Sequence, residues 1–170
     1  MKGTAGEFDL QILPEVLSFI EGEALRSRDG LETGGILLGT DDTQAIVVRH
    51  AGGPGPKARR ETHRFLRDLV HAQELADQVW KEDRSQWIGE WHTHPSGDLT
   101  PSQFDLENYF KHLLDPELGF SRFVSIIIGL TPKGEVASIP WVINRESAQP
   151  VPTANADHPN RHSVALRPNG

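Results

Sequence analysis

The sequence predicts one α/β domain, an α+β arrangement in which a mixed or antiparallel β-sheet is flanked by about three helices. Three observations support this. Short apolar or β-branched runs, bounded by glycine, proline or aspartate, recur along the chain and are typical of strands. Longer segments with apolar residues every three or four positions are typical of amphipathic helices. The chain has 170 residues, 36% of them hydrophobic, which suffices for one domain with a core but hardly for two.

Three segments have the spacing of amphipathic helices: 14–25, 68–82 and 101–114. Pro14 suits the first turn of the first helix, because its fixed φ angle fits there. For the third helix, we expect Thr100 as the N-cap, Pro101 as the first residue and Gln103 as the partner in a capping box. Apolar residues on one side of the second helix are Leu69, Leu75, Ala76 and Val79, and the core candidates of the third helix are Phe104, Tyr109, Phe110 and Leu113.

Five segments are predicted to be strands: 36–38, 44–50, 86–94, 122–130 and 135–143. The first two form a hairpin with Asp41 and Asp42 in its turn. After Asn144 the sequence becomes rich in proline, asparagine and alanine and loses its periodicity. We therefore expect one domain over residues 1–145 and a flexible tail over residues 146–170.

Composition excludes several kinds of site and ligand. The chain has no cysteine, so disulfides, thiolate metal sites and cysteine nucleophiles are excluded, and any metal ligand must be His, Asp or Glu. The net charge of −7 argues against a nucleic-acid partner. No segment approaches the roughly 18 apolar residues of a membrane span, so we expect no membrane association. The N-terminal residues lack the apolar core of a signal peptide, which makes a cytoplasmic location the default expectation.

One short segment carries the strongest candidate site. His92 and His94 are two positions apart in a predicted strand, so their side chains point to the same face, with α-carbons roughly 6.5–7 Å apart. Pro95 and Gly97 turn the chain, and the helix that follows can bring Asp105 back toward the histidine pair. Two imidazoles and one carboxylate, with a fourth position for water, are typical of a catalytic zinc site. A carboxylate outside the metal ligands is the usual proton acceptor in such a site.

Each of these residues also has a simpler explanation when it is taken alone. A His-x-His pair on a strand is more often incidental than metal-binding. Asp105 near a helix start suits the positive end of the helix dipole without any metal. It is the joint pattern that favours a metal centre.

A basic segment lies between the predicted hairpin and the second helix. Residues 57–67 hold five basic side chains and one acidic side chain, a local net charge of +4 on an acidic chain. Two interpretations stay open: a solvated loop and helix start, or a contact surface for an acidic partner or a substrate tail. The basic residues are Lys57, Arg59, Arg60, Arg64 and Arg67.

The string HTHPSGDLTPSQFD, residues 92–105, resembles the signature of the JAB/MPN metalloprotease family, also called JAMM. That signature has an upstream Glu, a His-Ser/Thr-His-Pro segment and, after seven intervening residues, Ser-x-x-Asp. His92, His94, Ser102 and Asp105 match it at the required spacing.

The upstream glutamate of the signature matches Glu32. Its surroundings, ETGGILLG, are similar to the prokaryotic branch of the family, and the order of elements agrees over residues 14–143. The resemblance implies the JAB/MPN fold, a cytidine-deaminase-like mixed sheet flanked by about three helices.

The resemblance also implies a role for each site residue. One zinc ion per chain would be bound by His92, His94 and Asp105. Glu32 would hold and deprotonate the water at the fourth position, and Ser102 would hydrogen-bond the oxyanion of the tetrahedral intermediate. The two glycines that closely follow Glu32 are expected to let the backbone pass close to substrate or metal.

Members of the family cut an isopeptide or peptide bond after the terminal glycine of ubiquitin or a ubiquitin-like protein. This chain resembles the stand-alone bacterial type, including the deconjugating peptidases of anti-phage (CBASS-like) operons that also encode E1-like and E2-like enzymes. The expected activity is therefore zinc-dependent deconjugation, or trimming of a precursor. The expected partners are a ubiquitin-like protein or its conjugates, and the E1-like and E2-like enzymes of the same operon.

Three alternatives stay open. The segment HPSGDLTPSQFD is also similar to the RadC-type branch, which is linked to DNA, although the N-terminal helix-hairpin-helix region usual in that branch is not evident. A non-catalytic module of the same fold would dock a ubiquitin-like tail without cutting it. An amidase acting on a small amino-acid or peptide conjugate would use the same site chemistry.

Overall fold

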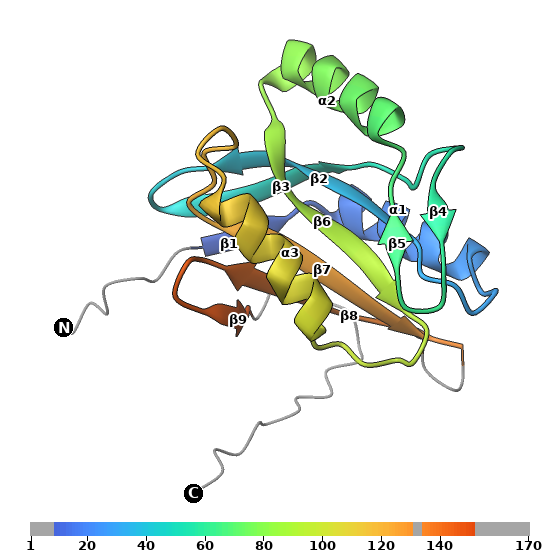
Figure 1. Ribbon diagram of the computed structural model, residues 1–170. Coiled ribbons are helices and arrows are strands. Elements are labelled where there is room, and N and C mark those ends of the chain that lie inside the picture. The colour runs from blue at the N-terminus through green and yellow to red at the C-terminus, as the bar shows by residue number, and fades with distance from the viewer. Residues whose placement is uncertain (1–8, 131–133, 152–170) are drawn as a thin grey trace, which may run out of the picture.

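A computed structural model describes residues 9–130 and 134–151 (Figure 1). They form a seven-stranded mixed sheet of order β1-β3-β2-β6-β7-β8-β9, a separate two-stranded hairpin and three helices. The strands of the sheet are β1 (Asp9–Ile12), β2 (Gly34–Asp41), β3 (Ala45–Ala51), β6 (Gln86–His94), β7 (Phe123–Leu130), β8 (Val136–Ile143) and β9 (Ala148–Pro150). The hairpin consists of β4 (Arg59–Arg60) and β5 (Phe65–Leu66), and the helices are α1 (Pro14–Arg26), α2 (Leu69–Asp83) and α3 (Gln103–Leu114). The predicted mixed sheet with about three helices is confirmed.

Strand β6 lies at the centre of the sheet and carries both histidines of the motif. It pairs antiparallel with β2 and parallel with β7. A parallel pair needs a crossover connection, and the segment between β6 and β7, which contains α3, supplies it. The carboxyl end of β6 and the start of α3 therefore lie together at one end of the sheet (Figure 1).

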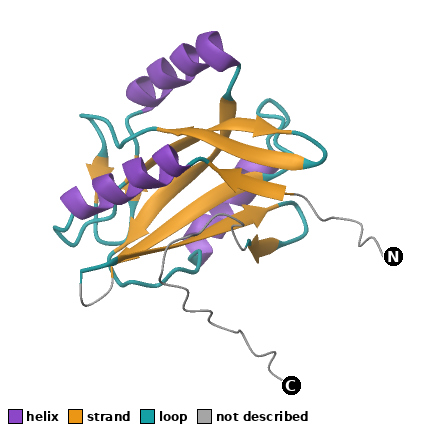
Figure 2. Cartoon of the chain, turned by 180° about the vertical axis from the view of Figure 1, so that it is seen from behind, coloured by secondary structure: helices purple, strands orange, loops and turns teal. Residues whose placement is uncertain are grey.

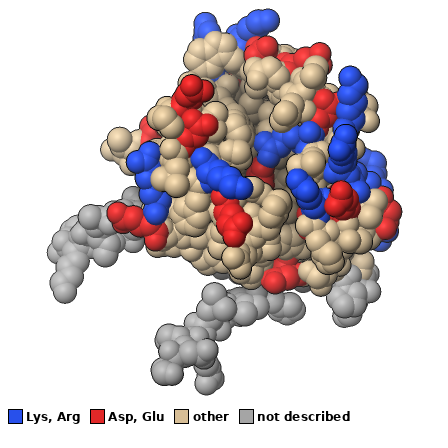
Figure 3. Space-filling view, in the orientation of Figure 1, with Lys and Arg blue, Asp and Glu red and all other residues tan. Residues whose placement is uncertain are grey.

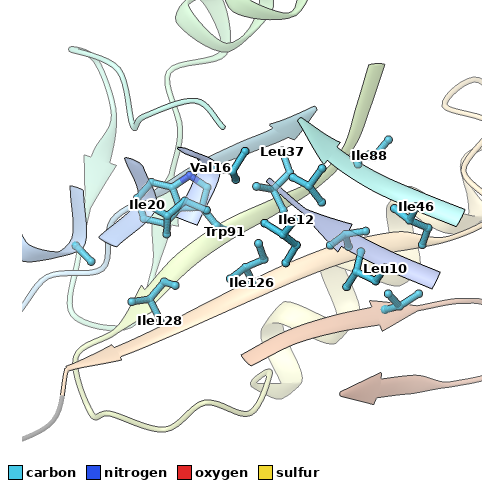
Figure 4. Packing of buried hydrophobic residues seen from close by; sticks show 14 residues of the cluster. Leu10, Ile12, Val16, Ile20, Leu37, Ile46, Ile88, Trp91, Ile126 and Ile128 are labelled. Atoms are coloured by element: carbon cyan, nitrogen blue, oxygen red, sulfur yellow. The ribbon is translucent and has the colours of Figure 1, made fainter. Parts of the chain in front are cut away.

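Helices cover both faces of the sheet. In Figure 1, α3 crosses the near face, and Figure 2, seen from behind, shows α1 on the opposite face. Ile20 of α1 packs with Trp91 and Ile126 in a core cluster in which these three side chains have no exposed surface (Figure 4). On the other face, Tyr109 of α3 packs against Phe123 of β7. In the part of the chain that the structure describes, no helix is long and apolar enough to cross a membrane.

Gly34 and Gly35 let β2 approach its neighbours closely. An added Cβ at Gly34 would lie 2.3 Å from the carbonyl oxygen of Trp91, and one at Gly35 would lie 1.8 Å from that of Gly52. We expected these glycines to leave room for substrate or metal. In the structure, the absence of these side chains instead makes room for neighbouring protein backbone. This close approach lies directly beside His92, which pairs with Gly34 in the register of β2 and β6.

The start of α3 differs from the prediction. The helix begins at Gln103, and its N-cap is Ser102 rather than Thr100. The capping box joins Ser102 to Asp105, and each side chain accepts a hydrogen bond from the backbone N–H of the other residue. An ionised carboxylate is a stronger acceptor than the amide of Gln103, which explains why this pair forms the box.

Phe104, which was predicted to lie in the core, is exposed, and so is Leu69 on the apolar side of α2. Phe104 is 44% and Leu69 is 74% exposed, and each lies in the first turn of its helix. Both line a cleft beside the motif, so the sheet does not cover them. The six other apolar residues named for these two helices are buried or partly buried.

Four short strands were not predicted: β1, β4, β5 and β9. Ala148–Pro150, which we assigned to the tail, forms β9 and pairs antiparallel with β8, for example Trp141 with Pro150. Three residues are too few to show an alternating pattern, so composition alone placed them in the tail. Residues 152–170 of the predicted tail lie outside the described residues.

Candidate metal centre and cleft

The motif brings three potential metal ligands together. The Nε2 atoms of His92 and His94 lie 3.0 Å apart. Asp105 Oδ1 lies 3.5 Å from His92 Nε2, and Asp105 Oδ2 lies 3.3 Å from His94 Nε2. One ligand atom from each residue lies within 4.8 Å of the others, and within residues 9–130 and 134–151 this is the one such group of His and acidic side chains. The prediction that these three side chains lie close together is therefore confirmed.

The hydrogen bonding of His94 fits a cation at this point. His94 Nδ1 lies 2.9 Å from the carbonyl oxygen of Asp98, which can only accept, so Nδ1 carries a proton. In the neutral ring, Nε2 then presents its lone pair toward His92 and Asp105. A histidine held by a backbone carbonyl through its other ring nitrogen is typical of metal ligands. A divalent cation would satisfy the acceptor atoms that face one another here.

The charges of the centre also favour a cation. Burial acts to raise the pKa of Asp105, but hydrogen bonds from His92 and His94 outweigh it, so its pKa lies well below the usual range. Burial acts to lower the pKa of His92, but Asp105 and the neighbouring carboxylates raise it overall. The carboxylates that surround His92 and raise its pKa also attract a metal ion.

Ser102 belongs to the same hydrogen-bond network. Its hydroxyl donates to Asp105 Oδ2 at 2.6 Å, and its backbone N–H donates to the same oxygen at 2.7 Å. Ser102 Oγ accepts in turn from the backbone N–H of Asp105 at 3.2 Å. Ser102 therefore orients the carboxylate of Asp105 in this structure.

Glu32 lies in the loop between α1 and β2 and lines the same cleft as His92 and Asp105. The next residue fixes this loop to β6, because Thr93 N–H donates to the Thr33 carbonyl at 2.8 Å and Thr33 N–H donates to Thr93 Oγ1 at 2.9 Å. Burial raises the pKa of Glu32 above its usual value, against the opposing charges of the histidines. A carboxyl group of raised pKa suits proton exchange closer to neutral pH.

A cleft of about 520 Å³ opens beside the metal centre. The β4–β5 hairpin and the start of α2 line one part of it, α3 lines another, and β6 contributes Trp87, Glu90 and His92. Basic and apolar side chains dominate the rest of the lining: Lys57, Arg59, Arg64, Leu66 and Phe104. The predicted site residues thus lie at the edge of a space that can hold a substrate.

Sequence reasoning missed the surroundings of His92. Glu90 Oε1 lies 3.9 Å from His92 Nδ1, and the other carboxylate oxygen pairs with Arg67. His92 Nδ1 is buried and has no hydrogen-bond partner among the described residues. Arg67 also lies over the ring of Trp87, 5.5 Å from its centroid. Glu90 precedes His92 by two positions, so the strand period would have placed it on the same face.

Comparison with known proteins identifies the family. Residues 22–144 match the sequence model described as prokaryotic homologs of the JAB domain. The chain belongs to this prokaryotic JAB family. The matched segment contains Glu32, the histidine pair, Ser102 and Asp105.

This JAB-family chain is similar to curated proteins that share the name CD-NTase/cGAS isopeptidase. The protein from Escherichia coli (strain TW11681) is 26% identical over 120 residues, 69% of this chain and 74% of the relative. That from Enterobacter hormaechei subsp. hoffmannii (strain UCI 50) is 34% identical over 111 residues, 61% of this chain and 58% of the relative. That from Vibrio cholerae serotype O1 is 30% identical over 88 residues, 51% of this chain and 56% of the relative. In the last two, the match spans less than two thirds of the relative.

The fold of this JAB-family chain also resembles a solved structure. The solution structure of a protein from Desulfitobacterium hafniense superposes with a TM-score of 0.60 at 17% identity. The similarity covers 90% of this chain and 99% of that protein, so it extends over the whole fold.

Proposed function

We propose that this JAB-family protein is a zinc-dependent isopeptidase that cuts after the C-terminal glycine of a ubiquitin-like protein, to release it from a conjugate or to trim a precursor. One observation carries the proposal: His92, His94 and Asp105 converge beside a cleft that Glu32 also lines. The relatives named CD-NTase/cGAS isopeptidase support an isopeptide bond as the bond that is cut.

His92, His94 and Asp105 would hold one zinc ion per chain. Two imidazoles and one carboxylate are a typical donor set of a catalytic zinc, with a position left for water. A zinc ion held by these residues would supply Lewis-acid chemistry: polarisation of a carbonyl group, and hydroxide at a pH of about 7. The burial of both histidines keeps bulk water away from the centre, which strengthens its electrostatic interactions.

Glu32 acts first as general base and then as general acid. Its carboxylate takes a proton from the attacking water as the water oxygen bonds to the carbonyl carbon. Its raised pKa then favours delivery of that proton to the nitrogen as the C–N bond breaks, so the amine leaves neutral. The hydrogen bonds between Thr33 and Thr93, one of them to the Thr93 hydroxyl, hold the loop that carries Glu32.

Ser102 has two roles in this proposal. In the structure, its hydroxyl donates to Asp105 and keeps that carboxylate in place. When substrate enters, the same hydroxyl exchanges this acceptor for the carbonyl oxygen that becomes the oxyanion. A hydroxyl donor placed where negative charge develops stabilises the transition state.

The substrate segment is extended. A cleft of about 520 Å³ holds a few residues of chain and excludes a folded domain, and a glycine-ended tail needs little room for side chains. The names of the relatives support a CD-NTase as the protein from which such a tail is released. We also propose that the protein acts in the cytoplasm, in anti-phage defence. Its partners there would be a ubiquitin-like protein and the E1-like and E2-like enzymes that act on it.

Intact-protein mass spectrometry tests this function. Zinc-loaded wild type should release a ubiquitin-like protein ending in glycine from an isopeptide-linked conjugate, and a linear fusion tests the trimming reaction. Glu32→Gln should leave the conjugate intact at equal zinc content. Cleavage that survives removal of zinc by a chelator would reject the mechanism. Binding of the conjugate by zinc-loaded wild type without any cleavage would favour the non-catalytic docking module instead.

A further inference from the structure

Two of the five basic side chains in residues 57–67 have acidic partners inside the protein. Arg60 donates to both carboxylate oxygens of Asp29, each at 2.8 Å. Arg67 pairs with Glu90 beside His92. These two arginines therefore support the structure of the site, and three basic side chains of the segment are left to explain.

Lys57, Arg59 and Arg64 form a basic rim on the cleft. All three are exposed and line it, and none forms an ion pair with an acidic side chain in the described part of the chain. Asp68, the carboxylate near Lys57, already accepts hydrogen bonds from three backbone N–H groups around the start of α2. Figure 3 shows Lys and Arg side chains gathered on the right of this face, over the hairpin of β4 and β5.

Apolar side chains lie beside the basic rim. Leu66 and Phe104 line the same cleft and are 42% and 44% exposed. The guanidinium carbon of Arg64 lies 5.8 Å from the ring centroid of Phe104, so the hairpin and α3 approach each other here. The cleft therefore combines a metal-binding edge with a surface that is both cationic and apolar.

We propose that the basic rim binds carboxylate side chains of the substrate protein within a few residues of the scissile bond, while an apolar side chain of the same segment packs on Leu66 and Phe104. The proposal rests on the proposed hydrolase function and adds the chemistry of the segment that is recognised. Charge complementarity supports it, because the rim is positive on a chain of net charge −7 that otherwise repels acidic ligands. The size of the cleft requires that the segment be flexible and extended.

A protein segment fits this surface better than a nucleic acid. The cleft also contains the carboxylates of Glu32, Glu90 and Asp105, which repel phosphate groups. A nucleic acid carries a negative charge at every nucleotide. A peptide can place carboxylates at the rim alone and present a neutral backbone to the metal centre.

Fluorescence anisotropy with labelled peptides tests the rim. The probes are two short peptides with a central Gly-Gly, one with aspartates on both sides and the other with asparagines in their place. The full zinc-loaded chain is compared as Glu32→Gln, to prevent turnover, alone or combined with Arg59→Gln and Arg64→Gln. The matched control combines Lys81→Gln on α2 with Arg84→Asn at its C-cap, which also removes two positive charges. Asparagine suits the left-handed conformation of Arg84, whose φ is 65°.

The aspartate peptide should bind at least about tenfold more tightly than the asparagine peptide, because several cation–carboxylate pairs act together. Salt raised from about 50 to about 300 mM should weaken binding of the aspartate peptide alone. The rim variant should lose the preference and the α2 control should keep it. Equal binding of both peptides, or a preference that survives in the rim variant, would overturn the proposal. Tighter, rim-dependent binding of a single-stranded oligonucleotide would overturn it as well.

Cleavage of the same peptides by wild type is followed in parallel, which separates this proposal from the proposed function. Charge-dependent binding without any cleavage of peptides or conjugates supports the proposed role of the basic rim and rejects the proposed hydrolase function. Cleavage that is equally efficient for both peptides, with equal binding, rejects the proposed role of the basic rim but is consistent with the proposed hydrolase function.

Discussion

Arg60 and Asp29 are joined by two hydrogen bonds of 2.8 Å, one to each carboxylate oxygen. Arg60 also donates to the carbonyl oxygens of Leu31 and Glu32, at 3.4 and 3.2 Å. The backbone N–H of Glu32 donates to the carbonyl of Glu61 at 2.8 Å. The hairpin that lines the cleft therefore also holds the loop that carries the proposed base.

Replacing Arg60 should impair the chemical step more than binding. Arg60→Gln removes four hydrogen bonds to this loop, and a small displacement of a catalytic group costs about 10- to 100-fold in rate. We expect kcat to fall by this factor while KM and zinc content change little, as measured by steady-state kinetics and metal analysis. Arg28→Gln is the control, because Arg28 donates to the carbonyl of Gly134 and not to the loop residues near Glu32. An unchanged kcat in Arg60→Gln would show that the pairing of Thr33 with Thr93 is sufficient.

Glu90 should tune the affinity for metal. With a metal on Nε2, His92 carries its proton on Nδ1, and the carboxylate of Glu90 lies 3.9 Å from that atom. Carboxylates in this position typically change metal affinity by about 10- to 100-fold. Glu90→Gln should weaken zinc binding by this factor in a competition titration with a chelator. Glu107→Gln, on the exposed side of α3, should leave the affinity unchanged, and equal affinities for both variants would exclude the role of Glu90.

Ser102 should affect stability and catalysis separately. Ser102→Ala removes the N-cap hydroxyl of α3, which typically lowers the free energy of unfolding by about 1 kcal/mol. Loss of a donor to the oxyanion should in addition lower kcat by about 100-fold. Ser102→Thr keeps both functions and should rescue both measurements. If Ser102→Ala lowers the melting temperature but leaves kcat unchanged, Ser102 acts only as the N-cap of α3 and has no role in stabilising the oxyanion.

Trp91 should stabilise the fold on the side of the sheet opposite the metal centre. Its indole N–H donates to the carbonyl of Gly52 at 2.8 Å in the fully buried core. Trp91→Phe leaves that buried carbonyl without its partner and should lower the free energy of unfolding by about 1–3 kcal/mol in urea denaturation. Trp80→Phe is the control, because Trp80 is 42% exposed, and should change stability by less than about 0.5 kcal/mol. Similar losses for the two variants would contradict this account.

The convergence of His92, His94 and Asp105 could be predicted because its geometry is local. The strand period places His92 and His94 on one face, and the turn after His94 returns Asp105, eleven positions along the chain, to this pair. The same period predicts that Trp91 points to the opposite face, and its place in the core against α1 confirms this. The roles of Glu32 and Ser102 in catalysis stay predictions.

What escaped prediction depends on contacts between distant segments. Helical periodicity identifies the apolar side of α2 and α3, but not where the sheet stops covering it, so the exposure of Leu69 and Phe104 was missed. The pairing of Arg60 with Asp29 joins residues 31 positions apart and depends on the path of two loops. The positive charge of residues 57–67 could be read from the sequence. Only the fold shows which arginines of this segment pair with acidic side chains and which basic residues form the rim of the cleft.

The central claim is that Glu32 performs proton transfer at a zinc centre that it does not itself bind. The most direct test is the rate of isopeptide cleavage by Glu32→Gln and wild type at zinc contents matched by metal analysis. We expect equal zinc content, near one per chain, and a loss of about 10²- to 10⁴-fold in kcat. A variant that keeps its zinc and retains a rate within about threefold of wild type would contradict it.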